Sequence, residues 1–437
     1  MAERRVAVTG LGVVTPSGVG IEALWTALLA GRSGVRPIAR FDAGAFPCRV
    51  GGELADFSAR GYVPRDYRKA VKVMARDIEI AVAAADLAFR DSGIVTRGID
   101  PQKTDIDTWR LACNIGAGLI CSDLNELGSA VSTAVVDGKF DLKAWGASGM
   151  NNLTPLWLLK YLPNMLACHV TIIHGCRGPS NTITCGDASG FLAVGEASRL
   201  VARGGAEAAV AGGAESKLNP MGLLRQGLLK RLSTCDAADA GRACRPFDAT
   251  HAGTVIGEGG GLVILEDLER ARGRGARIYA EVVAAGAACD PAGMDVTRPT
   301  AGSMGLAVQK ALAKAGLAPA DVDMILAHGT GVPDEDRCEV EAWRSAFGDK
   351  LGRIPAAALT GSIGSLFAGA GGVSIAVAAK ALHQQTVPPT VNFERPFDGC
   401  GLNLSAQPRQ TPIRHVVAGG FTIGGQSGAC VLKRYEE

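Results

Sequence analysis

Segments typical of β-strands and of helices alternate along both halves of this 437-residue chain. In the first half, the apolar run RRVAVTGLGVVTP (4–16) is typical of a buried strand and MARDIEIAVAAADLAFRDSG (74–93) of a helix. In the second half, the helical pattern SMGLAVQKALAKAGL (303–317) precedes the strand-like VDMILAHGTG (322–331). Because strands and helices alternate in this way in βα units, the sequence predicts an α/β fold with mostly parallel sheets.

Composition and charge argue against several classes of protein. Hydrophobic residues make up 47% of the chain and charged residues 20%, which is ordinary for a globular protein with a large core. The formal net charge is only +2 and no basic run is present, so nucleic acid is not an expected partner. No stretch reaches the ~18 consecutive apolar residues of a membrane-spanning helix, and no signal peptide precedes the first strand. We therefore expect a cytoplasmic protein without a membrane partner.

Motifs for a cofactor or a metal are incomplete. The GxG within TGLGVVTPSG (9–18) lacks the spacing of a dinucleotide-binding loop, and Pro16 stands where the phosphate-binding helix would begin. The 12 cysteines are scattered, without a CxxC pair or a Cys/His cluster, so we expect reduced and mostly buried thiols. The sequence predicts neither a cofactor nor a metal site.

The stretch GPSNTITCGDASGFLAVGEA (178–197) combines a bend of small residues with a helical pattern that runs to about Ala202. An α/β enzyme presents a nucleophile at such a turn, which we call the elbow. Asp187 stands at its apex, and Cys185 lies two positions earlier. The elbow is therefore either a working nucleophilic site or the remnant of one.

Seven motifs follow one another along almost the whole chain. They are VAVTGLGVVTPSG, GPSNTIT with GEA, LLKRLST, CRPFDATHAGTVIGEGGGLVILEDLERA, LAHGTGVPDEDRCEVEA, TGSIGSLFAGAGG and GGFTIGGQSGACVL. Together they resemble the β-ketoacyl-acyl-carrier-protein synthases of the KAS I/II type. The resemblance implies a thiolase-like, five-layered αβαβα fold built from two similar βαβαβαββ halves, usually dimeric. We place the halves at 1–265 and 266–437, with an insertion around 106–160.

The resemblance also implies a chemistry, which is Claisen condensation in fatty acid or polyketide biosynthesis. In the family a cysteine thiolate takes an acyl group from a carrier-protein thioester, and decarboxylation of a malonyl thioester supplies the attacking enolate. Two histidines stabilise the thioester and enolate oxygens, and a lysine supports the second histidine. The motifs place Asp187 at the cysteine position, His328 at the first histidine, Thr360 at the lysine and Ser365 at the second histidine. Three of these four positions are therefore substituted.

Asp187 is open to two interpretations. As a nucleophile, its carboxylate would form a mixed anhydride, and its charge would oppose the developing oxyanion. As a structural group, it would satisfy free N–H groups at the start of the helix that follows. Cys185 is either a shifted nucleophile or a small buried residue beneath the elbow. His328 donates to a carbonyl oxygen, pairs with Asp187 as a general base for water, or is a retained histidine satisfied by neighbouring backbone groups.

Binding roles follow from the same resemblance. The backbone N–H groups of Asp187 and Ile423 correspond to the family's oxyanion hole. Ile423 replaces the aromatic gate that the family usually has in this loop, with Thr422 before it, and both are candidate substrate-binding residues. Lys230 and Arg231 lie near where the family docks its acidic acyl carrier protein, so they are candidate contacts with that partner.

A retained scaffold that has lost its charged chemistry resembles the chain-length-factor subunits of type II polyketide systems, although their elbow usually carries Gln. We therefore expect a chain-length-factor-like partner of an active ketosynthase, as a heterodimer or homodimer, with acyl carrier protein as a further partner. The alternative is an acyltransferase that condenses, decarboxylates or hydrolyses acyl thioesters through Cys185 or Asp187 with His328. A regulatory or purely structural binder of acyl carrier protein is the third interpretation.

Overall fold

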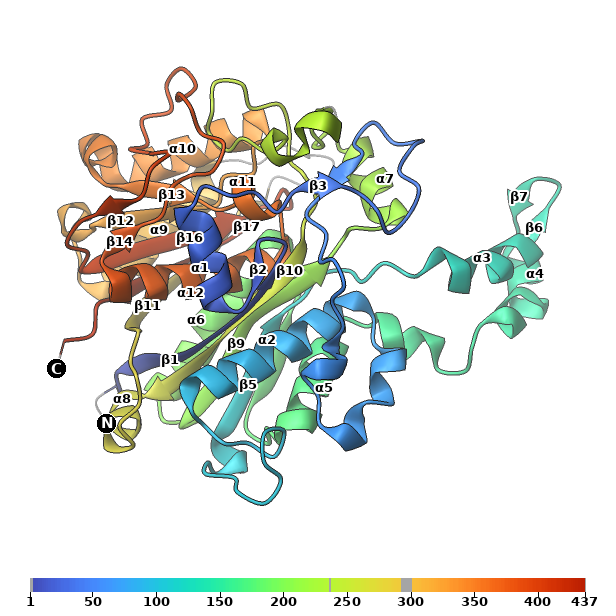
Figure 1. Ribbon diagram of the computed structural model, residues 1–437, viewed down its shortest axis with the longest axis horizontal. Helices are drawn as coiled ribbons and strands as arrows, with labels where there is room; N and C mark the ends of the chain where they lie inside the picture. Colours follow the sequence, from blue (N-terminus) through green and yellow to red (C-terminus); the bar gives the residue numbers. More distant parts are fainter. Residues whose placement is uncertain (1–2, 236, 292–300, 437) are drawn as a thin grey trace.

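One order of strands and helices occurs twice in the molecule, a computed structural model that describes residues 3–235, 237–291 and 301–436 (Figure 1). The first half contains β1 (Val6–Thr15), α2 (Arg76–Ser92), β5 (Leu111–Gly116), α5 (Met165–His174), β8 (Ser180–Ile183), α6 (Ser189–Ala202), β9 (Ala208–Ser216) and β10 (Glu258–Asp267). The second half contains β11 (Ala280–Cys289), α9 (Ala301–Ala315), β12 (Met324–Ala327), α10 (Pro333–Phe347), β13 (Ala356–Ala358), α12 (Ala368–Gln384), β16 (His415–Phe421) and β17 (Gln426–Lys433). Both halves therefore have the βαβαβαββ order that the family resemblance implies.

The two halves also share one sheet topology. The strand order is β1-β10-β9-β5-β8 in the first half and β11-β17-β16-β12-β13 in the second. β5 runs parallel to β8 and β9, as β12 does to β13 and β16. The prediction of mostly parallel sheets is wrong, because β10 pairs antiparallel with β1 and β9, and β17 pairs antiparallel with β11 and β16. β1 and β11 pair at Ala7↔Glu281 and Val8↔Ala280, which joins all these strands, with β2 (Gly18–Val19) beside β1, into one 11-stranded sheet. The topology therefore shows a duplication that the sequence shows only faintly.

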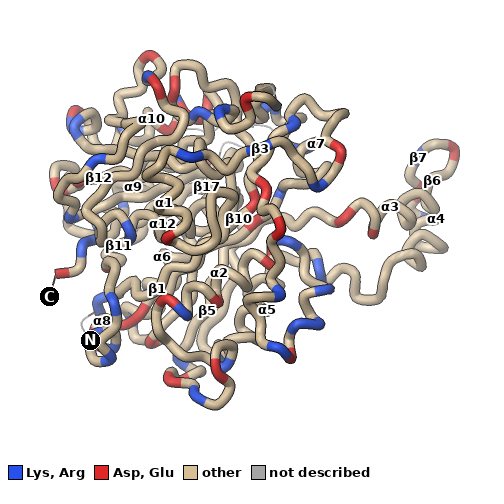
Figure 2. Tube along the Cα trace, viewed as in Figure 1, with Lys and Arg blue, Asp and Glu red and all other residues tan. Residues whose placement is uncertain are grey.

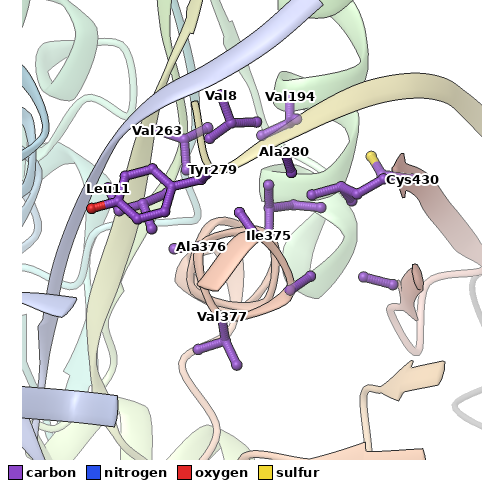
Figure 3. Packing of buried hydrophobic residues seen from close by; sticks show 14 of the residues in the cluster. Val8, Leu11, Val194, Val263, Tyr279, Ala280, Ile375, Ala376, Val377 and Cys430 are labelled. Carbon is purple, nitrogen blue, oxygen red and sulfur yellow. The ribbon is translucent and has the colours of Figure 1, made fainter. Parts of the chain in front are cut away.

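Alternating side chains of the strands divide the core into layers. Ala209 and Ala211 of β9 belong to the central core, whereas Val210 belongs to the outer core formed with α2 and α5. Leu326 of β12 likewise belongs to the central core, and Ile325 belongs to the outer core formed with α9 and α10. α6 and α12 fill the centre, where Figure 3 shows side chains of both halves gathered around α12. The layers are those of the predicted αβαβα fold.

Close approach of the central layers depends on glycine. A Cβ atom on Gly372 of α12 would lie 1.9 Å from the carbonyl oxygen of Gly261 in β10. A Cβ atom on Gly190 of α6 would lie 2.7 Å from the backbone nitrogen of Gly372. Because backbone atoms, and not flexible side chains, stand in the way, any larger residue would push the layers apart.

We expect Gly372→Ala to lower the free energy of unfolding by ~1–3 kcal/mol, because overpacking a dense core displaces backbone. The control is Gly302→Ala in α9, where an added Cβ atom meets nothing within 4 Å. Alanine is the better helix former, so this variant should be neutral or slightly more stable. Chemical denaturation measures both; a Gly372→Ala variant as stable as the Gly302→Ala variant would contradict the tight packing.

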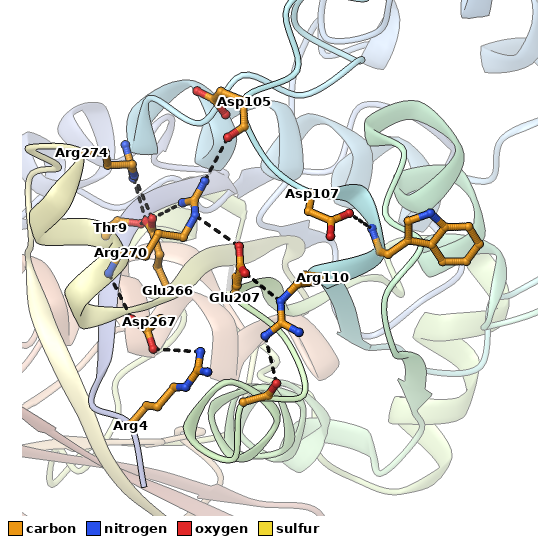
Figure 4. A network of polar contacts seen from close by, with 12 residues as sticks. Arg4, Thr9, Asp105, Asp107, Arg110, Glu207, Glu266, Asp267, Arg270 and Arg274 are labelled. Carbon is orange, nitrogen blue, oxygen red and sulfur yellow. Dashed lines mark hydrogen bonds and ion pairs between the residues drawn. The ribbon is translucent and has the colours of Figure 1, made fainter. Parts of the chain in front are cut away.

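A polar network closes one end of the first sheet (Figure 4). Glu266, near the end of β10, is fully buried and accepts hydrogen bonds from Thr9 at 3.0 Å and from Arg274 at 2.8 Å. Because Glu266 pairs with Ala208 at the start of β9, the network lies away from the carboxyl ends of β5, β8 and β9. The carboxyl ends of parallel strands are where α/β folds place their sites, and the elbow follows β8 there.

Residues 118–164 connect β5 to α5; Ile120 and Tyr161 near their ends belong to the outer core of the first half, and the part between them forms an arm that projects from the body at the right of Figure 1. It contains α3 (Leu124–Thr133), the hairpin of β6 (Val135–Val136) and β7 (Lys139–Phe140), and α4 (Leu142–Ala147). The expected insertion at 106–160 is wrong in its first part, because 111–116 is β5, buried between β8 and β9. Composition alone did not separate this strand from the loop-rich sequence that follows it.

Candidate functional site

The elbow turns sharply between β8 and α6, through a short 3-10 helix over Gly186–Ala188. Gly186 has a φ of +53°, and a Cβ atom there would lie 2.5 Å from the hydroxyl oxygen of Thr422. Both the backbone conformation and the limited space therefore call for glycine. The Ser189 hydroxyl closes the turn, because it accepts from the Cys185 N–H at 2.8 Å and donates to the Gly186 carbonyl at 2.7 Å. The apex side chain is thereby held at the start of α6.

The apex residue, Asp187, faces His328, which follows β12. Nε2 of His328 lies 3.4 Å from Oδ1 of Asp187, and the two side chains are only 2% and 4% exposed. Neither atom has a hydrogen-bond partner among the described residues, and their separation is that of an ion pair when the imidazole is protonated. Glu339 holds the histidine loop, since its carboxylate accepts the N–H groups of His328 and Gly329, each at 2.7 Å.

Opposite charges set the protonation states of this pair. Burial alone would raise the pKa of Asp187, but the His328 imidazolium, together with Arg231 and Lys217, holds it below its ordinary value. Burial alone would lower the pKa of His328, but Asp187 and Glu339 raise it. These shifts favour a carboxylate beside an imidazolium. An imidazolium can donate a hydrogen bond but cannot accept a proton, so in this state the histidine is not a general base for water.

We expect the pair to stabilise the fold most between about pH 4 and 6.5, the ordinary pKa values of Asp and His in an unfolded chain. The Asp187 pKa is lowered on folding, so its contribution is lost as the pH falls through the folded value. The His328 pKa is raised on folding, so its contribution is lost as the pH rises through the folded value. Asp187→Asn should lower the His328 pKa, which histidine NMR titration measures. A His328 pKa that does not move would show that the two groups are uncoupled.

Two further cations lie close to the pair, beside the ring of Phe367. The ring centroid is 4.8 Å from the Lys217 ammonium and 6.0 Å from the Arg231 guanidinium. Arg231 is 5% exposed, and two of its nitrogens donate to Glu335 at 2.6 and 2.8 Å. The prediction that Arg231 contacts an acidic carrier protein is therefore wrong, because its charge is turned inward and neutralised. Its neighbour Lys230 is exposed and remains a candidate contact.

Three charged residues near the elbow were not singled out from the sequence: Lys217, Glu215 and Glu335. Lys217 forms an ion pair with Glu215, which is fully buried and accepts the Ala368 N–H at 2.8 Å. Burial lowers the pKa of Lys217. One feature of the sequence could have indicated this cluster. Glu215 lies in the otherwise apolar and small-residue segment AEAAVAGGAES, and a charged residue in a buried strand needs a partner.

Thr360 and Ser365 do not supply the chemistry of the lysine and histidine positions. The Thr360 hydroxyl donates to the carbonyl oxygen of Gly329, which fixes it beside the histidine loop. Ser365 is 1% exposed, and its hydroxyl has no hydrogen-bond partner among the described residues. The segment 359–372 contains neither Lys nor His, so the loss of both groups does not depend on which residue is aligned with them.

The remaining candidates surround the turn. Cys185 is partly buried, and burial raises the pKa of its thiol, which reduces the reactive thiolate at neutral pH. Thr422 packs against Gly186, and its N–H donates to the carbonyl oxygen of Gln426 at 2.9 Å, which closes the loop between β16 and β17. Ile423, next in this loop, is partly exposed. The loop therefore lies against the elbow, where one of its side chains would control the access of a substrate to Asp187.

The structure of residues 3–235, 237–291 and 301–436 gives no support to a metal or a membrane span. In these ranges no three His, Cys, Asp or Glu side chains are grouped so that they could hold a metal ion. None of the helices described there has the length and apolar character needed to cross a membrane.

Comparison with known proteins places this site in a family. Residues 3–271 match the Beta-ketoacyl synthase, N-terminal domain, and residues 279–394 match the Beta-ketoacyl synthase, C-terminal domain. This chain belongs to the beta-ketoacyl synthase family. It is 32% identical over 435 residues to 3-oxoacyl-[acyl-carrier-protein] synthase 2 of Coxiella burnetii, with 99% of each chain covered. It is 34% identical over 437 residues to the tetracenomycin polyketide synthase ketoacyl synthase beta subunit of Streptomyces glaucescens, with 98% of each chain covered.

Solved structures lead to the same family. The ishigamide ketosynthase/chain length factor matches this beta-ketoacyl synthase family member with a TM-score of 0.85 and 26% identity, covering 100% of each chain. AntDE:AntF, a type II PKS acyl-carrier protein in complex with its ketosynthase, matches with a TM-score of 0.83 and 26% identity, covering 99% of this chain and 100% of that one. The thiolase-like scaffold of fatty acid and polyketide synthesis is thus present, and the residues at the elbow decide what it can do.

Proposed function

We propose that this chain is a non-condensing subunit of the beta-ketoacyl synthase family that works beside a catalytically complete ketosynthase, in the manner of a chain length factor. The observation that carries the proposal is the buried Asp187–His328 ion pair at the apex of the elbow. Similarity over nearly the whole chain to the tetracenomycin beta subunit and to the ishigamide ketosynthase/chain length factor supports it.

The substituted residues oppose each step of condensation. Attack by the Asp187 carboxylate on a thioester would give an anhydride, which is far less stable than the starting thioester, and the negative charge would oppose the oxyanion. Decarboxylation of a malonyl thioester needs donors for the enolate oxygen, and segment 359–372 contains neither Lys nor His. His328 is a donor, but its Nε2 atom already faces Oδ1 of Asp187 at 3.4 Å. The fold persists without the groups that perform the reaction.

The proposed partners are a ketosynthase, in a heterodimer, and acyl carrier protein. In this arrangement the active subunit performs the condensation, and Thr422 and Ile423, next to the elbow, restrict the space open to the acyl chain. Lys230, exposed on the surface, is the proposed contact for the acidic carrier protein.

A second candidate function is acyl transfer or thioester hydrolysis by this chain itself. The partial exposure of Cys185 favours it, because a thiol two residues before the apex is open to a substrate from outside. The raised pKa of the Cys185 thiol weakens it, because less of the thiol is present as the reactive thiolate.

Intact-protein mass spectrometry after mixing with an acyl-carrier-protein thioester separates the two functions. We expect an unmodified chain and an intact thioester. An acyl adduct that maps to Cys185 and disappears in Cys185→Ala would establish the second function instead. Loss of the thioester without an adduct, abolished by His328→Ala, would show hydrolysis and would equally overturn the proposal.

A further inference from the structure

A polar cluster that the proposed function does not use surrounds His251. The side chain of His251 is only 4% exposed, and its Nδ1 atom lies 2.9 Å from Oδ2 of Asp336. Asp336 is fully buried, and its two oxygens also accept the N–H groups of Phe247 and Gly331, at 2.8 and 3.0 Å. Because a carboxylate accepts hydrogen bonds, Nδ1 carries a proton and donates it to Asp336.

The other nitrogen of this ring faces open space. His251 lines a cavity of about 530 Å³, a volume in the range of small-molecule sites. Since Nδ1 is turned to Asp336, Nε2 on the opposite edge of the ring is the atom that can reach the cavity. Nε2 forms no hydrogen bond with another described residue. A polar atom on a buried ring that has no partner in the protein indicates that a ligand supplies one.

Two arginines bring positive charge to this cavity. Arg395 lines it, is exposed, and has no partner for its guanidinium among the described residues. Arg337 also lines it and lies 3.4 Å from Asp334, but the two side chains are 56% and 71% exposed. An exposed pair of this kind is weak, so the guanidinium is available to a ligand. Among the lining residues these two cations face one carboxylate, that of Asp398.

Apolar groups complete the wall. The His251 ring stacks on Phe397, with the ring centroids 5.1 Å apart and the planes at 15°, and the Arg337 guanidinium carbon lies 5.9 Å from the Phe397 centroid. One aromatic ring therefore positions both groups. Pro333 and Pro396 also line the cavity. Figure 2 shows acidic as well as basic residues around α10, so the donors at the cavity, and not the overall charge of this face, favour an anion.

The number of donors favours a phosphate group. Guanidinium groups bind carboxylates and phosphates through paired N–H donors. A phosphate monoester has three free oxygens, enough for both arginines and for His251, whereas a carboxylate has two. Nε2 of His251 donates to a phosphate oxygen when the ring carries a second proton, and accepts from a P–OH group when it does not. The same cations disfavour a metal ion.

We propose that this cavity binds a phosphate group, free or carried by a small molecule, between His251, Arg337 and Arg395. An organic ester would place its apolar part against Phe397 and the two prolines. The inference does not depend on the proposed function, because none of the residues that line the cavity belongs to the elbow.

Isothermal titration calorimetry of the full chain with phenyl phosphate and with inorganic phosphate tests the site. We expect each to bind saturably, with one molecule per chain. Arg395→Gln should weaken the binding of phenyl phosphate by at least ~10-fold, because one charge-assisted contact is lost. The control is Arg353→Gln, which removes an exposed arginine outside the cavity and should leave the affinity unchanged. Circular dichroism confirms that each variant is folded.

Histidine NMR locates the bound phosphate. The chain has six histidines, and the signal that is lost in His251→Gln belongs to residue 251. Phenyl phosphate should shift the Nε2 signal of His251 and leave that of His383, exposed at the end of α12, unchanged. Tighter binding of phenyl phosphate than of inorganic phosphate would identify an organic ester as the ligand, and equal affinities would identify free phosphate.

Three results would overturn the inference. A lack of saturation by either probe at ~1 mM would show that the cavity is not a phosphate site. Equal affinities of the wild type and the double variant Arg337→Gln with Arg395→Gln would place the bound phosphate elsewhere. Benzoate that binds as tightly as phenyl phosphate would make the ligand a carboxylate. The acylation experiment above tests the proposed function separately from all three.

Discussion

A Glu335→Gln substitution is expected to lower the free energy of unfolding by ~3–5 kcal/mol, the cost of leaving a buried guanidinium without its counterion. Both carboxylate oxygens of Glu335 accept from Arg231, at 2.6 and 2.8 Å, and the two residues are 3% and 5% exposed. An amide keeps one acceptor oxygen but presents an N–H group to the other guanidinium nitrogen. Chemical denaturation measures the loss.

The neighbouring residue offers a matched control. Asp334 pairs with Arg337 on the surface, where the side chains are 71% and 56% exposed, so Asp334→Asn should change stability by less than ~0.5 kcal/mol. The double variant Arg231→Met with Glu335→Leu should recover much of the loss, because apolar residues of similar size carry no desolvation cost. If Glu335→Gln lowered the free energy of unfolding no more than Asp334→Asn, the Arg231 guanidinium would not depend on this carboxylate, and water or another residue would take its place.

Asp187→Cys is expected to restore acylation of the chain without restoring condensation. A thiol at the start of α6, close to the cations Lys217 and Arg231, has its pKa lowered, and this increases the fraction of reactive thiolate. The substitution also removes the charge that opposes the oxyanion. Segment 359–372 still lacks Lys and His, so the acylated variant should not turn over a malonyl thioester. Intact mass spectrometry detects the first effect, and product analysis tests the second.

Two further variants identify the acylated atom. Asp187→Asn should remain unmodified, and the adduct on Asp187→Cys should survive an added Cys185→Ala substitution. An adduct located on Cys185 would move the nucleophilic position two residues along the elbow. Formation of a β-ketoacyl product by Asp187→Cys would show that the missing lysine and histidine are not needed for decarboxylation.

Much of the architecture could be predicted from the sequence, because buried strands and helices impose different periodicities on apolar residues. The strand at 4–16 is β1, the helix at 74–93 is α2, and the helix after the elbow ends at Ala202 as predicted. The insertion boundary was predicted less well. β5 is a short buried strand whose neighbours, β8 and β9, lie far along the chain, so its place in the sheet is not visible locally.

Arg231 is a second case in which the local sequence does not reveal a contact with a distant part of the chain. Lys230 and Arg231 are adjacent cations in one motif, and their sequence suggests one exposed basic patch. Lys230 has a φ of +55°, so the chain reverses there after α7 (Pro220–Leu228) and turns the next side chain inward. The partner that makes this burial tolerable, Glu335, stands on α10 in the other half of the molecule.

The sequence by itself determined which chemical groups this protein has at the family's catalytic positions. It showed an aspartate at the elbow, a histidine after the VDMILA strand, and no lysine or histidine in 359–372. Only the tertiary structure decided that Asp187 and His328 meet and that Lys217 and Arg231 lie near them. The reason is physical: the residue type is a local property, whereas the state of a charge depends on its burial and on neighbours that the two packed halves bring together from distant parts of the chain.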